Sequence, residues 1–292
     1  MRRTAVIGPG RVGTALGMAL AAAGYEVVAV AGHSQASTEE FLRRVPSATA
    51  LALPDAARAA ELVVVAVPDD VLAAVIRNAA RDDAVTPGSR WVHVSGGHGT
   101  DVLRPVRLAG AAVAACHPAQ TFPDPDTGLA ALPGCSWAVT AAEPDLGWAR
   151  VLVTDLRGRP VTVPARSRTL YHAGLTVGSN ATATVVTLAR DLLLGAGVSD
   201  PAAFLGPLVT TSAANAVASG AAALTGPVRR GDAGTVAAHL AELRESLPEA
   251  VDAYLALSRL ALAHARRAGL EPERADAVAT ALDDDQASGS GG

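Results

Sequence analysis

The sequence contains no lysine, so all 24 of its basic residues are arginine. This absence excludes any mechanism that needs a lysine as acid, base or Schiff-base former. Only 3% of the 292 residues are aromatic and the formal net charge is −4. The chain therefore lacks both the stacking platforms and the basic surface that are typical of nucleic-acid-binding proteins. A small molecule is the expected partner, and no nucleic acid.

Long apolar runs and clusters of metal-binding residues are also missing. No stretch reaches the roughly 18 uninterrupted apolar residues of a membrane span, and Met1-Arg2-Arg3 leads into a strand-like run, not a signal peptide. Cys116 and Cys135 do not have the number or spacing of a disulfide framework or a zinc site. We therefore expect a soluble, cytoplasmic chain with reduced, buried cysteines, no membrane contact and no metal.

What the sequence does contain is enough apolar material for a large packed core. Half of its residues are hydrophobic and 18% are charged, which excludes a mostly disordered chain. In the first part, short β-branched runs alternate with helical segments, which predicts a mainly parallel sheet with helices on both faces. The predicted strands lie near 4–7, 26–31, 49–51, 62–67, 91–95, 111–116, 136–140 and 160–163.

The pattern changes near residue 164, after which helix formers dominate. Long helices are predicted near 167–194, 201–222, 233–245 and 247–268, and in the first part Asp69 or Asp70 is expected to cap a helix over 71–80. We expect an α/β Rossmann-type doubly wound domain over residues 1–165 and an all-α domain for substrate binding and dimerisation over 166–280. The polar, glycine-rich segment 281–292 is predicted to be a disordered tail.

The most informative motif is G-P-G-R-V-G at residues 8–13, which follows a strand-like run and opens a helical one. In such a loop Gly8 permits the tight turn, Gly10 lets the backbone approach a pyrophosphate, and Gly13 lets the helix pack on the strand. The helix N-terminus at Arg11 and Val12 offers amide donors to phosphate. The motif predicts a dinucleotide site; the alternative is a structural turn in another α/β fold.

The end of the second predicted strand indicates which dinucleotide binds. Residues 31–35 contain no carboxylate, so nothing repels the 2′-phosphate that distinguishes NADP from NAD. His33 and Ser34 can donate hydrogen bonds to that phosphate, with Arg11 or Arg43 as further donors. The pattern favours NADP (NADPH); NAD and a flavin-type cofactor such as F420 remain alternatives, as does an ordinary loop without a binding role.

Three other segments lie at the carboxyl ends of predicted strands, where open parallel sheets form their ligand crevice. Val67 and Pro68 are expected to border the nicotinamide. Ser95, with the two glycines after it, is expected either to contact substrate or to form a plain turn. His117 lies after a buried run, and the choice between a functional imidazole and one satisfied by backbone stays open.

A polar face on an otherwise apolar helix is the other candidate for chemistry. At 100° per residue, His172, Thr176 and Ser179 fall within about 60° of one another, with Asn180 beside them. His172 is the first candidate for general acid because an imidazole titrates near neutral pH. The alternative is a hydrogen-bonded contact between helices.

Six ordered motifs extend the pattern along the chain. They are G-P-G-R-V-G at 8–13, V-P-D-D at 67–70, H-V-S-G at 93–96, H-P-A-Q-T-F-P at 117–123, Y-H-A at 171–173 with S-N at 179–180, and L-T-G-P-V-R-R-G-D at 224–232. Together they resemble the Rossmann-like proteins that carry a domain of unknown function, DUF2520. The resemblance runs from residue 4 to about 270, and that family is similar to the wider 6-phosphogluconate dehydrogenase-like superfamily. It implies an N-terminal nucleotide domain, a helical C-terminal domain and a homodimer.

The same resemblance implies an NADP-dependent oxidoreductase, with reduction of a small, ketopantoate-like 2-oxo acid as the leading expectation. β-Hydroxyacid dehydrogenases and ketopantoate reductases use a lysine in the corresponding helix, so His172, Ser179 and Asn180 would have to replace it here. Two alternatives remain: reduction of an imine of the pyrroline-carboxylate type, and a non-catalytic NADP-binding sensor or scaffold.

Overall fold

The computed structural model describes residues 2–283, whose contacts group into two compact units that meet between Ser179 and Asn180. The first unit contains all of the strands and ends with α8 (Arg168–Thr176). The boundary predicted after residue 165 therefore differs from the limit of the compact unit. The division into domains over 1–165 and 166–280 stays a prediction.

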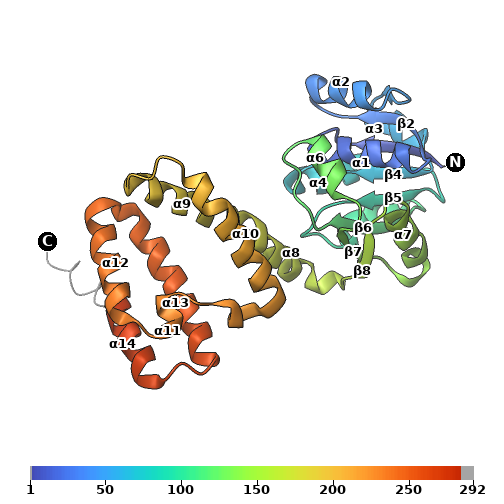
Figure 1. Cartoon of the computed structure of the whole chain (residues 1–292). Coiled ribbons are helices and arrows are strands. Elements are labelled where there is room, and N and C mark those ends of the chain that lie inside the picture. The colour runs from blue at the N-terminus through green and yellow to red at the C-terminus, as the bar shows by residue number, and fades with distance from the viewer. Residues whose placement is uncertain (1, 284–292) are drawn as a thin grey trace, which may run out of the picture. The chain divides into compact units, whose positions relative to one another are not determined.

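The first unit is built on one eight-stranded sheet with the order β3-β2-β1-β4-β5-β6-β7-β8 (Figure 1). All neighbouring strands run parallel except β6 and β7, which are antiparallel. The eight predicted strands are all present, and the Rossmann-type fold is confirmed. The strands are β1 (Arg3–Ile7), β2 (Glu26–Ala31), β3 (Thr49–Ala50), β4 (Leu62–Val65), β5 (Arg90–His93), β6 (Ala112–Pro118), β7 (Ser136–Thr140) and β8 (Arg159–Thr162).

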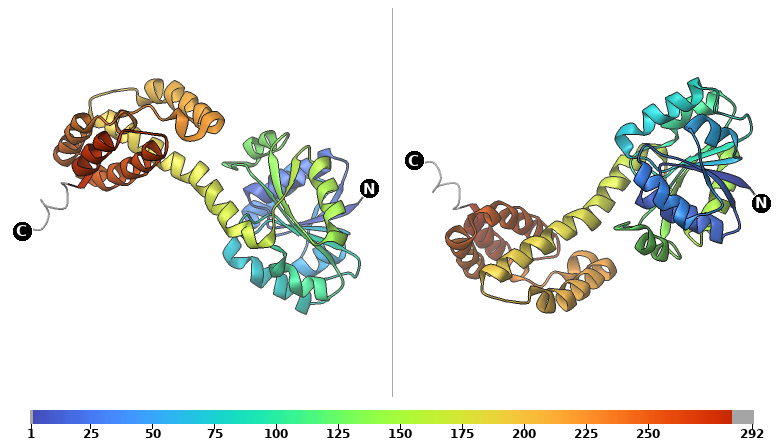
Figure 2. Two further views of the ribbon diagram at one scale, coloured as in Figure 1. Left: turned by 90° about the horizontal axis from the view of Figure 1, so that it is seen from below. Right: turned by 90° about the horizontal axis from the view of Figure 1, so that it is seen from above.

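Helices cover both faces of this sheet and form two separate cores (Figure 2). Leu16, Leu20 and Phe41 are buried on one face, and Ile76 and Leu103 are buried on the other. Strand β4 is buried along its whole length because it receives side chains from both cores. The helices are α1 (Arg11–Ala22), α2 (Gln35–Arg44), α6 (Pro125–Ala131) and α7 (Glu143–Asp155) on the first face, and α3 (Leu53–Arg58), α4 (Asp69–Arg81), the short 3₁₀ segment η1 (Thr100–Leu103) and α5 (Arg104–Leu108) on the second.

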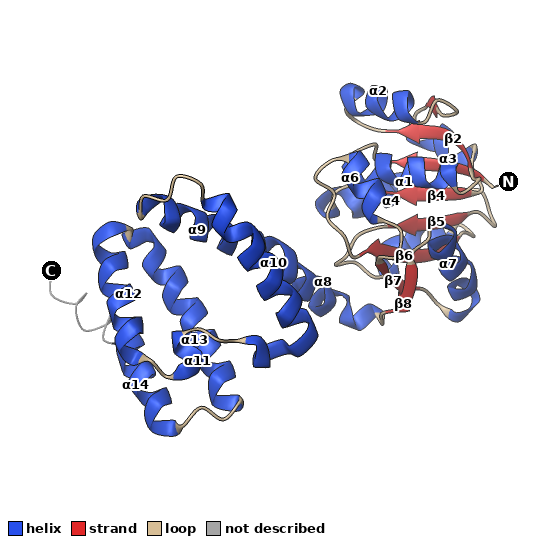
Figure 3. Cartoon of the chain, viewed as in Figure 1, coloured by secondary structure: helices blue, strands red, loops and turns tan. Residues whose placement is uncertain are grey.

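The second unit is entirely helical (Figure 3). Its core is formed mainly by α12, α13 and α14, with Leu240, Leu262 and Val278 among its buried residues. No helix among residues 2–283 is long and apolar enough to cross a membrane. The helices of this unit are α9 (Thr182–Gly195), α10 (Pro201–Ser219), α11 (Pro227–Arg230), α12 (Ala233–Ser246), α13 (Val251–Arg267) and α14 (Pro272–Asp283).

Three local predictions are wrong. The helix predicted over 167–194 is interrupted by the π-helical turn η3 (Val177–Ala181). Helix α4 starts one residue after Pro68, so Asp69 and Asp70 lie in its first turn and do not cap it. Residues 281–283 of the predicted tail belong instead to α14, where Leu282 is buried in the core; the rest of the predicted tail lies outside the described residues.

Candidate functional site

The carboxyl ends of five parallel strands meet at one edge of the sheet (Figure 1). These are the ends of β2, β1, β4, β5 and β6, and the glycine loop and most of the predicted site residues of the first unit follow them. Open parallel sheets bind their ligands at this edge, close to the point where the strand order reverses. Here the order reverses between β1 and β4.

The glycine loop connects β1 to α1 as the motif predicts. Gly8 has φ +98°, which favours glycine, and a Cβ atom there would lie 2.6 Å from the carbonyl oxygen of Ala66. A Cβ atom at Gly13 would overlap the carbonyl oxygen of Gly8. The two glycines thus allow the turn after β1 to contact both the end of β4 and the first turn of α1.

Gly10 differs from these two, because no atom lies within 4 Å of the position that its Cβ would take. It precedes the first turn of α1 in an extended conformation, and no side chain caps this turn. The amides of Arg11, Val12 and Gly13 are therefore available as donors at the positive end of a 12-residue helix. An open position beside uncapped amides fits a pyrophosphate, so these residues can hold a dinucleotide.

Arg11 does not turn its guanidinium back to this helix terminus. Its Nη1 donates to the carbonyl oxygen of Pro123, 3.3 Å away, in the loop that follows β6. The predicted role of Arg11 in cofactor binding stays a prediction, and this contact places its charge between the glycine loop and the β6–α6 segment.

The turn after β2 holds His33 and Ser34, both of which are exposed. Ser34 caps α2: its Oγ accepts a hydrogen bond of 3.3 Å from the amide of Ser37. Its hydroxyl hydrogen can still be donated, and no carboxylate stands in residues 31–35. Arg43 is paired with Glu40, so its charge is partly neutralised. The turn suits a phosphate by its donors and by its lack of negative charge.

Val67 and Pro68 connect β4 to α4 on the other side of the glycine loop. A Cβ atom at Gly8 would lie 2.8 Å from Cγ1 of Val67, so Val67 packs directly on the loop. Pro68 occupies the N-cap position of α4 and has no amide hydrogen to donate. Both residues stay candidates for cofactor contact.

The turn after β5 is organised by a buried histidine. His93 is fully buried; its Nδ1 accepts from the amide of Ser95 at 3.2 Å, and its Nε2 lies 2.9 Å from the carbonyl oxygen of Gly99. Burial lowers the pKa of His93 to about 4, so this imidazole is neutral at pH 7. The Oγ of Ser95 accepts from the amide of His98, which gives it a role in the turn as well as its predicted place in the site.

Two of the predicted catalytic residues lie side by side at this turn. The rings of His117 and His172 are edge to face with their centroids 5.9 Å apart. A Cβ atom at Gly96 would lie 2.5 Å from Cδ2 of His172 and 3.0 Å from Nε2 of His117, so both imidazoles contact the turn where it has no side chain. Strand β6 carries one histidine and α8 the other, which brings residues 55 positions apart in the sequence into one cluster.

Tyr171 completes this histidine cluster, and the sequence analysis did not assign it a role. Its hydroxyl lies 2.9 Å from Nδ1 of His117. The ionisable groups whose charge affects His117 are Arg168, His172, Asp69 and His93. Burial is the largest cause that lowers the pKa of His117 to about 4, and the charge of Arg168 is the second. At neutral pH the imidazole of His117 is therefore uncharged.

Arg168 is the other residue that the sequence analysis missed. Its side chain is 1% exposed and lies beneath the cluster, with its guanidinium carbon 5.9 Å from the ring centroid of Tyr171. An isolated arginine near the start of a helix is normally a solvated residue, so the pattern of the sequence carries no signal for its burial.

The polar helix face predicted around His172 is only partly formed. Ser179 lies in the π-helical turn η3, where the 100° spacing on which the prediction depends does not hold. Asn180 belongs to the second compact unit. The structure therefore groups His172 with His117 and Tyr171, and the roles of Ser179 and Asn180 stay predictions.

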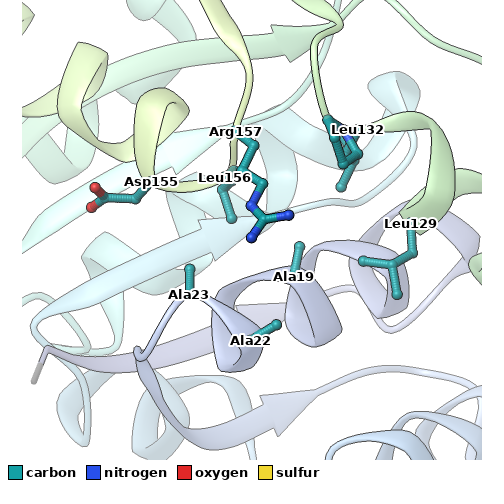
Figure 4. A pocket seen from close by; sticks show the side chains of 9 residues that line it. Ala19, Ala22, Ala23, Leu129, Leu132, Asp155, Leu156 and Arg157 are labelled. Atoms are coloured by element: carbon teal, nitrogen blue, oxygen red, sulfur yellow. The ribbon is translucent and has the colours of Figure 1, made fainter.

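A pocket of about 250 Å³ lies elsewhere in the first unit, between α1, α6 and the end of α7 (Figure 4). Small and apolar side chains such as Ala19, Leu129 and Leu156 line it, together with Asp155 and Arg157. None of the predicted site residues is among its lining residues. The pocket is separate from the histidine cluster and carries none of its chemistry.

Comparison with known families agrees with this architecture. The profile of the Rossmann-like domain matches residues 2–118, and that of the domain of unknown function DUF2520 matches residues 135–261. At the sequence level, no curated protein matches the chain.

Solved structures of similar fold cover nearly the whole chain. A candidate NADP oxidoreductase from Bacteroides fragilis is 22% identical with a TM-score of 0.76, over 89% of this chain and 97% of that one. A protein from Thermotoga maritima is 19% identical with a TM-score of 0.67, over 90% and 98%. An imine reductase from Myxococcus stipitatus in complex with NADP⁺ is 17% identical with a TM-score of 0.56, over 99% and 96%. With both family profiles in order along it, the chain is a Rossmann-like and DUF2520 domain-containing protein.

Proposed function

We propose that the chain is an oxidoreductase that reduces a small molecule with a nicotinamide dinucleotide, preferring NADPH to NADH. One observation carries the proposal: the glycine loop follows β1, the turn against which both histidines pack follows β5, and these two parallel strands end at the same edge of one sheet. Hydride transfer needs an acceptor held against the nicotinamide and a proton donor beside it. The cofactor supplies the hydride, and the protein supplies orientation and the proton.

His172 is the proposed proton donor. Its ring lies against the turn at Gly96 and Gly97, where no side chain separates it from the edge of the sheet. His117 is neutral at pH 7, so its proposed role is to orient the substrate by a hydrogen bond. Since the chain has no lysine, the donor must be another group, and histidine is the side chain that serves most often as a general acid or base.

A small 2-oxo acid is the leading substrate class. The acceptors of Arg168 are a hydroxyl and backbone carbonyls, so no carboxylate among them neutralises its charge. A positive charge beneath the cluster favours a substrate that carries a carboxylate. The ketopantoate-like acids suggested by the family resemblance have this chemistry.

Imine reduction is the second candidate. The structures of similar fold include imine reductases from Myxococcus stipitatus and Pseudomonas sp. and a reductive aminase from Aspergillus terreus in complex with NADPH. A C=N acceptor needs the same hydride and proton as a C=O acceptor, so the proposed roles of the histidines apply to both.

The test is a screen of NADPH and NADH oxidation by the purified chain over small 2-oxo acids and cyclic imines. We expect turnover with one class, and a loss of about tenfold or more in His172→Ala. Unchanged turnover in that variant would show that another group is the proton donor. Tight binding of NADPH without turnover of any compound would instead identify a sensor or scaffold and refute the proposed oxidoreductase.

We also propose that the chain is a homodimer that associates through the second unit. Helix α10 has no charged residue in its 19 positions, and within the described chain only Pro201 and Leu205 of this helix are buried. Phe204 and Leu208, one helical turn apart, are 63% and 62% exposed. An apolar helix with large exposed side chains is typical of a surface that another protein chain covers.

The dimer is tested by light scattering after size exclusion. We expect the native chain to elute with twice its chain mass of 29.3 kDa, and Leu208→Glu to elute as a monomer. The matched control is Leu108→Glu, which introduces the same charge at an exposed leucine of the first unit. A native chain that scatters as a monomer at micromolar concentration would refute the dimer.

A further inference from the structure

Arg168 is a buried arginine whose guanidinium makes five hydrogen bonds. Its five N–H groups point to five different acceptors, which belong to three strands or the turns after them. Every N–H donor of the guanidinium therefore has an acceptor. Nε donates to Oγ1 of Thr140 at 2.9 Å, Nη1 to the carbonyl oxygens of Ser95 at 3.4 Å and Gly96 at 3.5 Å, and Nη2 to those of Ala115 at 2.9 Å and Ala138 at 3.3 Å.

All of these acceptors are uncharged. A buried arginine is normally paired with a carboxylate, because removing an unpaired charge from water costs several kcal/mol. Burial lowers the pKa of Arg168, yet an arginine remains protonated in proteins. An apolar side chain of similar size would fill this place at lower cost, so packing alone does not account for the guanidinium.

The position of Arg168 connects it to the histidine cluster. It is the first residue of α8, and His172 stands four positions later on the same helix face. The turn that accepts from Nη1 is the one that contacts the imidazoles, since Gly96 lies against both His117 and His172. The guanidinium thus connects the helix that carries one histidine to the turn against which both are packed.

We propose that Arg168 is the positioning residue of this site: without touching substrate, it fixes the first turn of α8 against the turn after β5 and places a positive charge beside the histidine cluster. The inference deepens the proposed function, since it concerns the same site, but the charge state of His117 can be measured without any turnover.

Ionisable groups from three elements act by charge on His117. Arg168 and His172 come from α8, His93 from β5 and Asp69 from α4, and only Asp69 favours the imidazolium. The hydroxyl of Tyr171 bonds to Nδ1 and is neutral at pH 7, since burial raises the pKa of the phenol. Removing the guanidinium removes the largest charge effect that disfavours protonation, and burial remains.

The experiment compares Arg168→Met with Arg166→Met in the full-length chain. Arg166 lies two residues earlier and is exposed, so its replacement controls for the loss of an arginine near α8. Histidine nuclear magnetic resonance is recorded against pH, with His117 assigned through His117→Gln. We expect the pKa of His117 to rise by about one unit in Arg168→Met and to stay unchanged in Arg166→Met.

Two further variants separate charge from geometry and cover the case in which Arg168→Met does not fold. Arg168→Lys keeps the charge but cannot reach five acceptors. Thr140→Val removes the acceptor of Nε, together with the hydrogen bond that the same hydroxyl donates to the carbonyl oxygen of Val163, and leaves the other four acceptors of Arg168 in place. We expect both to leave the pKa of His117 low and to lower kcat severalfold, with the KM for NADPH unchanged. A pKa of His117 that is unchanged in Arg168→Met overturns the charge role, and full kcat in Arg168→Lys overturns the positioning role. If the screen finds no substrate, the nuclear magnetic resonance experiment still tests the charge role of Arg168.

Discussion

Gly96 is the residue on which the geometry of the histidine cluster depends most directly. Its missing side chain leaves the space that the edges of two imidazoles occupy, with the nearest ring atom 2.5 Å from the position of a Cβ atom. Gly97, the next residue, would bring its Cβ atom no closer than 3.4 Å to His172, which is ordinary contact. Two adjacent glycines therefore differ in what they permit.

We predict that Gly96→Ala lowers turnover by about tenfold or more, because the methyl group displaces the imidazoles from their working geometry. The melting temperature should change little, since the ends of partly exposed rings can move. Gly97→Ala is the control and should retain most of its activity. Steady-state kinetics measure turnover, and thermal melting measures stability. Equal activity in Gly96→Ala and Gly97→Ala would contradict the proposed site.

The residues of this cluster differ in how far the sequence could predict them. His117 and His172 could be singled out because polar residues at a strand end and on an apolar helix are unusual. Their contact with each other could not, because it depends on how α8 packs beside β6. Arg168 gave no signal, since nothing in the local pattern distinguishes a buried arginine from a solvated one. Tyr171 belongs to the Y-H-A motif, but that motif indicated only the family and no role for the phenol.

The β1–α1 connection is the element for which sequence and structure agree most closely. A strand, a glycine at positive φ and an uncapped helix start all follow from the spacing of three glycines. Two of these glycines differ in the space around them. A side chain at Gly13 would overlap the backbone, whereas the space at Gly10 is open. Substitution can therefore separate binding from folding.

We predict that Gly10→Ala weakens NADPH binding roughly tenfold while the melting temperature changes little, because the added methyl group meets only the approaching phosphates. Gly13→Ala should instead lower the melting temperature, since its Cβ atom overlaps backbone. Fluorescence titration and thermal melting measure the two effects. Unaltered NADPH affinity in Gly10→Ala would show that no pyrophosphate approaches this loop.

The β2–α2 connection is proposed to select the cofactor. Ser34 caps α2, and aspartate and asparagine cap helices as well as serine does. Ser34→Asp should therefore retain the helix while it adds a negative charge where a 2′-phosphate would bind. We predict that the preference for NADPH over NADH falls about tenfold or more. The control is Ser34→Asn, because asparagine is neutral and has nearly the same shape as aspartate. This variant should keep the preference for NADPH, and binding titrations with both cofactors measure it.

The helices after residue 165 show what the spacing of apolar residues can and cannot predict. The starts of α10 and α12 follow from Asp200 and Asp232, whose side chains accept from amides three residues later. The π-helical turn at 177–181 could not be predicted, because one extra residue in a turn leaves no mark on a pattern of apolar side chains. Helix α14 has no counterpart among the predicted helices, although Pro272 at its first position is a residue that helices favour there.

At the scale of the whole molecule, the two neutral histidines of the first unit couple its stability to pH. In the unfolded chain a histidine has a pKa near 6.5, whereas His93 and His117 both have a pKa of about 4 in the folded state. Between these values the unfolded chain binds protons that the folded chain does not. The contribution is fully present above pH 6.5 and is lost as the pH falls toward 4.

We predict that the free energy of unfolding decreases by as much as about 1.4 kcal/mol per pH unit for each of these histidines between pH 6.5 and 4. Urea denaturation at a series of pH values measures this slope. His93→Gln should be less stable at pH 7, because the buried contacts to Ser95 and Gly99 are weakened, but its slope should be shallower. His33→Gln, at an exposed position, is the control and should keep the native slope. A slope in His93→Gln as steep as in the native chain would mean that the buried imidazole takes up a proton without unfolding, and that the turn after β5 does not depend on its neutral form.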